Sequence, residues 1–321
     1  MTFDFDISEH VTFLASPALE GRAPGSDGSR VAREYITNTF RGCGLTPLFD
    51  GKRSFTQDID VDGKVHGVNV GGIIEGKKPG YILVGAHYDH FSFSPGADDN
   101  AAAVAQVLVV AEYFGRHPLP NSQGMLFLAF DCEEPPHFHQ PSMGSRFFVE
   151  HCPVPLDEIQ VAIVLDLTGH LVPKPRLEHC LFAIGMEHAT ATIDAVLKAA
   201  KDARGIQVFP ASNNRVGDMS DHHAFRINKR PFIFLSCGRT EHYHTRTDTI
   251  ENLNLPKANA IASFLANLVE TCADGNEFEF NPEQGQKFME EAEAAALSRL
   301  LGRHVTVPEV DGLVDELSRG L

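Results

Sequence analysis

Residues 83–100 read LVGAHYDHFSFSPGADDN. The stretch begins in a short apolar run, which is typical of a buried strand. His87 and Asp89 follow that run, and after a loop of Phe, Ser, Pro and Gly the stretch ends in an acidic group at 98–100. A strong helical pattern, AAAVAQVLVVAEYF, continues at 101–114. Side chains of the metal-ligand type therefore lie at the end of a predicted strand and at the start of a predicted helix, which is where α/β folds build their sites.

The composition is that of a globular protein, and its charge argues against several partners. Of the 321 residues, 43% are hydrophobic and 22% are charged, and the formal net charge is -16. This acidic balance disfavours nucleic acid as a partner, because phosphate binding needs clustered Lys and Arg. The sequence has no polybasic run and no stretch of about 18 apolar residues, so we expect neither a membrane partner nor a membrane span.

The N-terminal sequence and the cysteine pattern bear on the cellular location of the protein. The start MTFDFDISEH is acidic and mixed, unlike a signal peptide, so we expect a cytoplasmic protein, or a secreted or periplasmic one if a signal has been removed. The six cysteines show no CxxC pair, and we expect free thiols, with a Cys152–Cys180 disulfide as the alternative.

Continuous apolar runs alternate with amphipathic helical patterns along most of the chain. We expect strands at 55–61, 68–74, 81–86, 125–130, 161–167, 181–184, 207–209 and 231–235. We expect helices at 26–40, 101–114, 145–152, 190–203 and 256–271, with short ones after residue 8 and from residue 221. This alternation predicts an α/β domain at 1–273 with a mainly parallel sheet covered on both faces. The polar segment 274–321 reads as a helical C-terminal appendage.

Carboxylates and imidazoles recur at the carboxyl ends of the predicted strands. They are His87, Asp89, Asp98, Asp99, Asp131, Glu133, Glu134, Asp166, His242, His244 and Asp248, with Tyr243 among them. Acids beside buried strands are costly unless they are paired or bound to metal. Carboxylate plus imidazole without thiolate suits zinc or a similar divalent ion in a catalytic site. So many groups suit two ions bridged by a carboxylate, with Glu133-Glu134 supplying one ligand and one base.

The same segments, taken in order, resemble the co-catalytic di-zinc aminopeptidases of metallopeptidase family M28, which include leucyl aminopeptidases. The matching motifs are AHYDH at 86–90, PGADDNAAAVA at 95–105, DCEE at 131–134, VLDLTG at 164–169, SDHHAF at 220–225 and YHTRTDT at 243–249. The lead-in FLASPALEGRAPGSDGSRVAREYI at 13–36 is also similar to the family's, so the resemblance covers roughly 8–272. It implies a three-layer α/β/α sandwich with a mixed, mainly parallel central sheet of the zinc exopeptidase (phosphorylase/hydrolase-like) kind, plus C-terminal helices.

The resemblance implies a role for each matching residue. The metal ligands are His87 and Asp166 on one zinc, Glu134 and His244 on the other, and Asp99 on both. Asp89 would hold His87 in the right tautomer, and Glu133 would be the general base. Asp98 is the alternative bridge and is otherwise expected to cap the following helix. For Tyr243 the choice lies between polarising the scissile carbonyl and packing, whereas Asp221 and His222 are expected to have structural or pocket-lining roles.

The function implied is that of a zinc aminopeptidase with two Zn²⁺ per chain, or other divalent ions, acting on peptides with a free N-terminus. A zinc-bridging water would be the nucleophile. The alternatives are a single-zinc acyl transferase similar to glutaminyl cyclase, a dipeptidase or carboxypeptidase of the same fold, and a non-catalytic binding homologue. The segment 134–144 is Pro-rich and longer than the family's usual turn, which leaves side-chain specificity open. The appendage is expected to be a dimerisation element, a lid, or a helix pair on the same core.

Overall fold

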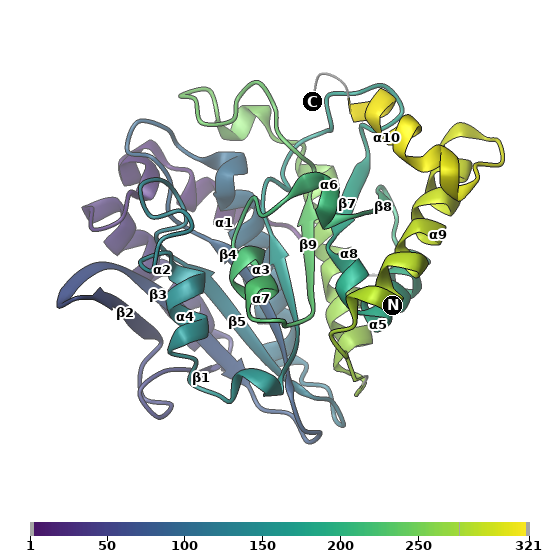
Figure 1. The fold of residues 1–321 in the computed structure, drawn as a ribbon. Helices are drawn as coiled ribbons and strands as arrows, with labels where there is room; N and C mark the ends of the chain where they lie inside the picture. Colours follow the sequence, from purple (N-terminus) through teal and green to yellow (C-terminus); the bar gives the residue numbers. More distant parts are fainter. Residues whose placement is uncertain (1–2, 276, 319–321) are drawn as a thin grey trace.

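The computed structural model describes residues 3–275 and 277–318, and its centre is a 9-stranded sheet (Figure 1). The strands are β1 (Thr46–Pro47), β2 (Thr56–Val61), β3 (Lys64–Ile74), β4 (Tyr81–His87), β5 (Gly124–Phe130), β6 (Ile159–Leu165), β7 (Cys180–Ile184), β8 (Gln207–Ala211) and β9 (Phe232–Ser236). Their order across the sheet is β1-β3-β5-β4-β6-β9-β7-β8, and β2 pairs with β3.

The middle of the sheet is parallel and its flanks contain antiparallel pairs. β4 runs parallel to β5 and to β6, and β6 runs parallel to β9. β3 pairs antiparallel with β5 on one side, and β7 pairs antiparallel with β9 on the other. The predicted mixed sheet is therefore confirmed, and its four central strands end at one common edge.

Helices cover both faces of the sheet, as the sequence predicted. The helices are α1 (Ser8–Leu14), α2 (Asp27–Gly42), α3 (Ala102–Arg116), α4 (Gly144–Glu150), α5 (Thr190–Ala200), α6 (Asn213–Val216), α7 (His222–Ile227), α8 (Leu255–Ala273), α9 (Pro282–Leu301) and α10 (Val310–Ser318). In Figure 1, α4 and α7 lie in front of the central strands, and α3 and α8 lie behind them. These positions form the three layers of an α/β/α sandwich.

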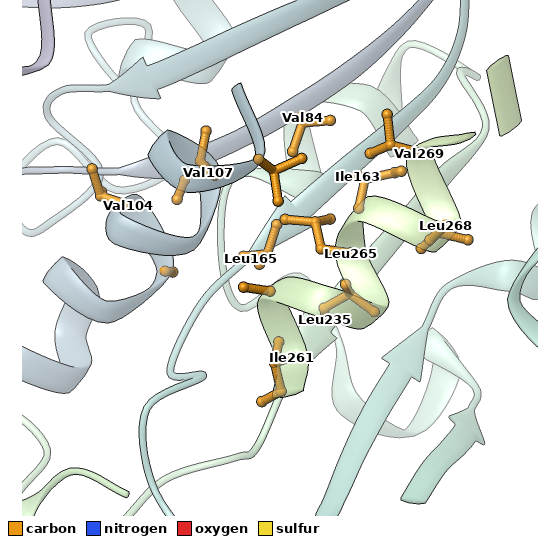
Figure 2. Close-up of a cluster of buried hydrophobic side chains, with 14 of the residues drawn as sticks. Val84, Val104, Val107, Ile163, Leu165, Leu235, Ile261, Leu265, Leu268 and Val269 are labelled. Carbon is orange, nitrogen blue, oxygen red and sulfur yellow. The ribbon is translucent and has the colours of Figure 1, made fainter. Parts of the chain in front are cut away.

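Alternation along β4 divides the core into two apolar layers, because successive side chains of a strand point to opposite faces. Ile82 and Val84 pack in the layer with α3 and α8, whereas Leu83 packs with Phe148 of α4 and Phe225 of α7. Figure 2 shows the first layer, in which Val84, Ile163, Leu165 and Leu235 of the sheet meet Val104 and Val107 of α3 and Ile261, Leu265, Leu268 and Val269 of α8. Full burial of each such side chain contributes about 1.5–3 kcal/mol, so this layer fixes both helices on the sheet.

The hairpin between β2 and β3 is tighter than the sequence pattern suggested. Its turn consists of Asp62 and Gly63, which both have positive φ, 54° and 77°. Two residues in this conformation form the turn that suits the twist of a two-stranded hairpin. Val61 therefore pairs directly with Lys64, and the polar residues 64–67 join β3 instead of forming a loop.

The C-terminal helix α9 packs along the β8 edge of the main domain. Its Met289 belongs to the main core, and its Leu297 packs with Phe209 of β8. The buried carboxylate of Glu293 accepts a hydrogen bond from the backbone N–H of Ser212 at 2.9 Å. Figure 1 shows α9 and α10, in yellow, at the β8 side of the sheet. Residues of this segment thus share a core with the sheet.

All six cysteines are free thiols, and five of them are buried. Among the described residues, no helix combines the length and apolar character needed to cross a bilayer.

Candidate metal centre

The four central strands place the predicted ligands at one edge of the sheet. His87 is the last residue of β4, and Asp166 directly follows β6. Glu133 and Glu134 come after β5, and the loop beyond β9 carries His244. Because β5, β4, β6 and β9 are neighbours, residues up to 157 positions apart in sequence meet at this edge.

Asp99 reaches the same place from the turn that precedes α3. The turn comprises Ala97–Ala101, and the Asp99–Asn100 peptide bond within it is cis. The backbone N–H groups of Asp98 and Asp99 donate to the two carboxylate oxygens of Asp248, at 2.8 and 3.0 Å. The direction of the Asp99 side chain is thereby fixed from the loop beyond β9.

The two carboxylate oxygens of Asp99 face two different imidazoles. Asp99 Oδ1 lies 3.3 Å from His87 Nε2, which in turn lies 3.5 Å from Asp166 Oδ1. Asp99 Oδ2 lies 3.2 Å from His244 Nε2, which also lies 3.2 Å from Glu134 Oε1. The five residues therefore form two triads that share Asp99.

Both triads have the spacing and chemistry that a divalent ion requires. Ligand bonds of about 2.0–2.1 Å in a tetrahedral site put neighbouring ligand atoms about 3.3 Å apart. The four N–O distances above lie within 0.2 Å of that value. In addition, His87 Nε2 and Asp166 Oδ1 are buried and have no hydrogen-bond partner among the described residues, which is costly unless a cation completes the site. The residues present thus fit two zinc-type ions.

Two further side chains lie close enough to compete as ligands. His87, Glu133 and Asp166 can also be grouped around one ion, as can His90, Asp99 and Glu134. Glu133 Oε2 lies 3.9 Å from His87 Nε2, farther than the oxygens of Asp99 and Asp166. Glu133 thus lies beside the first triad, at a longer distance from His87 Nε2 than the carboxylates of Asp99 and Asp166.

Asp89 holds the centre together through backbone groups. His87 Nδ1 lies 3.1 Å from the Asp89 backbone oxygen, to which it can donate, so that Nε2 is left free for the triad. The Asp89 carboxylate lies 3.6 Å from the same nitrogen. It accepts the backbone N–H groups of Glu133 and Glu134, each at 3.1 Å. Asp89 therefore positions the base candidate and a ligand candidate at once.

Asp98 points away from both triads. Its Oδ1 accepts the backbone N–H of Gly169 at 2.8 Å, and its Oδ2 lies 2.6 Å from His170 Nδ1. These contacts join the turn before α3 to the segment after β6. Of the adjacent pair Asp98-Asp99, only Asp99 faces the imidazoles of the centre.

Glu133 is surrounded by charge and closed off from solvent. Burial raises the pKa of its carboxyl well above the usual value, His87 opposes this rise, and the nearby carboxylates of Asp166, Glu134 and Asp221 add to it. A high proton affinity is what a group needs to accept a proton from a reacting water. Cations bound to the triads would offset part of the surrounding negative charge.

A stack of flat groups borders the second triad. The rings of Tyr243 and His244 lie 3.7 Å apart between centroids, and the guanidinium of Arg239 lies 4.4 Å from the Tyr243 ring. Phe91 meets His244 edge-on at 4.7 Å. Burial raises the pKa of Tyr243, as do the carboxylates of Asp99 and Asp166, so its phenol stays protonated and can donate a hydrogen bond near neutral pH.

Two residues near the centre were not singled out from the sequence. Arg22 is fully buried, and its guanidinium donates to the backbone oxygens of Leu14, Tyr88, Pro95 and Gly96. It ties the N-terminal segment to the loop after β4. His90 is fully buried beside Glu134. Both lie inside motifs quoted from the sequence, so motif membership was the available signal, but their contacts are long-range and left no local pattern.

The long segment after Glu134 packs against α7. The rings of His139 and His223 stack at 4.0 Å, and His139 Nε2 lies 3.1 Å from the Asp218 backbone oxygen. A separate cavity of about 680 Å³ is lined by residues 170, 171, 173, 239–242 and 252–254. His170, which contacts Asp98, and Arg239, which contacts Tyr243, connect this cavity to the residues of the centre.

Comparison with known proteins identifies a family and several relatives. The model of peptidase family M28 matches residues 69–269, a span that includes every predicted ligand. The chain is 25% identical to the uncharacterized protein YfbL of Escherichia coli K12 over 282 residues, 78% of this chain and 83% of YfbL. It is 28% identical to aminopeptidase YwaD of Bacillus subtilis 168 over 190 residues, 56% of this chain but 38% of YwaD.

Solved structures share the fold at low sequence identity. LapA aminopeptidase of Legionella pneumophila has a TM-score of 0.67 at 17% identity, covering 85% of this chain and 71% of LapA. A Zn-dependent exopeptidase of Parabacteroides distasonis has a TM-score of 0.65 at 18% identity, covering 84% and 99%. Glutaminyl cyclase of Tannerella forsythia has a TM-score of 0.64 at 17% identity, covering 82% and 97%. The architecture is therefore that of the zinc exopeptidases, which glutaminyl cyclase also shares.

Proposed function

This chain belongs to peptidase family M28, and on that premise we propose that it is a zinc aminopeptidase that hydrolyses the N-terminal peptide bond of peptides. The observation that carries the proposal is the position of Asp99, whose two oxygens face His87 and His244 separately. A carboxylate in this position suits a pair of ions better than one. The aminopeptidase activity named for YwaD agrees with this choice of substrate.

Five residues would hold the ions. His87, Asp166 and Asp99 Oδ1 form one position, and Glu134, His244 and Asp99 Oδ2 form the other. Two bound zinc ions would polarise the scissile carbonyl and lower the pKa of a coordinated water. The hydrogen bonds that the carboxylates of Asp89 and Asp248 accept from the backbone N–H groups of these residues keep the two positions in place.

Glu133 is proposed as the general base and, later, the general acid. Its carboxylate would take a proton from the attacking water and give it to the leaving amine. The bond from its backbone N–H to Asp89 fixes where the side chain starts, and burial raises its pKa toward the range a base needs. Tyr243 is proposed to donate its phenol proton to the carbonyl oxygen as negative charge develops there.

The substrate proposed is a peptide with a free N-terminus. Its α-ammonium group would lie among the carboxylates of the centre, where a positive charge is favoured. The cavity beside Arg239 and His170 offers space next to the centre for the rest of the peptide. A dipeptidase or carboxypeptidase would differ in the substrate end that is held, so a panel containing free and N-acetylated peptides separates these activities.

A cyclase similar to that of Tannerella forsythia is the second candidate, since that enzyme shares the fold. This chain has all three members of the second triad, Asp99, Glu134 and His244. Their presence favours the two-ion peptidase over a single-zinc acyl transferase. The sequence also contains no Trp. Zinc analysis of the purified chain separates the candidates, because about two ions per chain are expected for the peptidase and one for the cyclase.

The test of the proposed function is release of amino acids from aminoacyl-p-nitroanilides. We expect activity that is lost on chelation and restored by zinc. Glu133→Gln should lower kcat by about 10²–10⁴-fold while both ions remain bound. The matched control is Glu158→Gln, an exposed glutamate at the opposite end of β6. Chelator-resistant hydrolysis, or full activity of Glu133→Gln, would contradict the proposal.

A further inference from the structure

His90 is a buried imidazole that no step of the proposed reaction uses. Its side chain has no exposed surface, and its Nδ1 lies 2.8 Å from Glu134 Oε1. The same nitrogen lies 3.8 Å from Asp99 Oδ2. His90 therefore stands directly behind the two oxygens that face His244.

The chemistry of His90 and Glu134 shows which of the two donates the hydrogen bond between them. An ionised carboxylate only accepts hydrogen bonds, so Nδ1 of His90 carries the hydrogen that Glu134 Oε1 receives. His90 Nε2 is buried and has no hydrogen-bond partner within residues 3–275 and 277–318. The His90 ring is held edge-on against Phe91 and His244, with centroids 5.3 and 5.7 Å away. The ring has little freedom to direct Nδ1 elsewhere.

Glu134 Oε1 then has two partners of different kinds. The 2.8 Å contact with His90 Nδ1 is a hydrogen-bond length, whereas the 3.2 Å contact with His244 Nε2 has the spacing of two ligands on one ion. A carboxylate oxygen has two lone pairs. A bond from His90 to one lone pair leaves the other directed to the point that Glu134 shares with Asp99 and His244.

His90 makes its polar contacts with ligand atoms of the second metal position. The first position consists of His87, Asp166 and Asp99 Oδ1. Within the part of the chain that the structure describes, the ion-pair contacts of His90 do not include any of these. Its contacts are with Glu134 Oε1 and Asp99 Oδ2, which both belong to the second position. A change at His90 should therefore act on one ion and not on both.

We propose that His90 is a positioning residue for the second metal position, where its Nδ1–H bond to Glu134 directs that carboxylate toward the ion. This inference rests on the proposed two-ion function. Hydrogen-bond partners of ligating carboxylates commonly contribute about 10–100-fold to metal affinity. Loss of the donor should weaken the second ion by that factor and leave the first ion unchanged.

The experiment titrates zinc into the metal-free full chain in competition with a chelating indicator, and repeats the titration with cobalt(II), whose absorption reports the ligand geometry. His90→Leu removes the donor. His90→Asn keeps an amide N–H at the δ position, where Nδ1 stood, and His90→Gln moves it one bond farther out. His117→Leu, at an exposed histidine just beyond the far end of α3, controls for loss of one imidazole. Unfolding of the metal-free variants in urea shows whether each is folded.

We expect wild type and His117→Leu to bind two ions, and His90→Leu to bind the first normally and the second about 10–100-fold more weakly. His90→Asn should recover most of the second affinity, and His90→Gln less. If His90→Leu fails to fold, the contrast between Asn and Gln decides, because a merely structural polar residue would tolerate both.

Three results would overturn the proposal: unchanged affinities in His90→Leu, equal weakening of both ions, or no recovery in His90→Asn. A wild-type chain that binds one ion contradicts the two-ion function independently. His90 is then judged on that single ion, since loss of its affinity in His90→Leu supports the bond to Glu134 and unchanged affinity overturns it.

Discussion

Asp248 Oδ2 accepts a hydrogen bond from the backbone N–H of Asp99 at 3.0 Å, across 149 positions of sequence. The other oxygen of Asp248 accepts the N–H of Asp98 at 2.8 Å. Asp248 is 2% exposed, so both bonds are shielded from water. The loop after β9 thus fixes the turn whose carboxylate faces both triads.

Replacing Asp248 with asparagine should weaken both the fold and the metal centre. The new NH₂ group would face a backbone N–H, so one bond is lost and a buried donor is left unpaired, at a cost of about 1–3 kcal/mol. Because Asp99 belongs to both triads, zinc affinity should fall at both positions by about 10-fold or more. Urea unfolding and zinc titration measure the two effects. Asp194→Asn, exposed on α5, is the control, and an unaltered zinc affinity in Asp248→Asn would refute the role given to this bond.

Tyr243→Phe distinguishes catalysis from packing. The phenyl ring can keep its stacking on His244, but it cannot donate a hydrogen bond to the carbonyl oxygen. Removal of one such donor commonly lowers kcat by about 10²–10³-fold, so we expect a fall in kcat with little change in KM. Tyr113→Phe, on α3 away from the centre, should behave as wild type. If the kcat of Tyr243→Phe is also unchanged, the residue only packs.

Stability should decrease as the pH falls below about 6.5, and His222 should cause part of this decrease. Burial lowers the pKa of His222 from 6.5 to about 4, although its contact with the Gly217 oxygen opposes this. In the unfolded chain the imidazole gains a proton near pH 6.5, whereas in the folded chain it stays neutral until about pH 4. Protonation therefore favours the unfolded chain in this window, by about 2 kcal/mol between pH 7 and pH 5.

His222→Phe should remove that part of the pH dependence. The phenyl ring can stack on Phe234, as the imidazole does at 4.2 Å, but it has no proton to gain. The free energy of unfolding is measured in urea at pH 7 and pH 5, with a chelator present so that metal release does not contribute. The exposed His117→Phe serves as the control. An equally steep loss of stability in wild type and His222→Phe would exclude His222 as a cause.

Substitution of Glu293, followed by an unfolding measurement, tests whether the C-terminal helices are part of the main domain. It accepts the Ser212 N–H at 2.9 Å and faces Arg215 Nη2 at 3.2 Å. Glu293→Ala leaves the buried Ser212 N–H unpaired and removes one of the two carboxylates at Arg215, which keeps its pair with Asp311, so we expect about 1–3 kcal/mol loss of stability in a single unfolding transition. Glu291→Ala, on the exposed face of the same helix, should have little effect. A separate transition for the C-terminal segment would instead show an independent appendage.

The sequence predicted the elements of this fold because each is encoded locally. The apolar run that became β4 and the helical pattern that became α3 contain the information for their own conformation. The placement of His87 and Asp166 at strand ends was also predictable, since parallel strands end at one edge. The extension of β3 to Lys64 was missed, because residues 64–67 lack the continuous apolar character of the other predicted strands, although Asp62-Gly63 is typical of a two-residue hairpin turn.

The sequence by itself determined which residue types meet at the edge of the sheet, since strand patterns and motif order are properties of the chain. Only the tertiary structure decided what each side chain does there. Asp98 turns to Gly169 while its neighbour Asp99 faces the imidazoles, and His90 bonds to Glu134. The physical reason is that side-chain direction after a strand is set by loop backbone and by hydrogen bonds between distant segments, which no local pattern records.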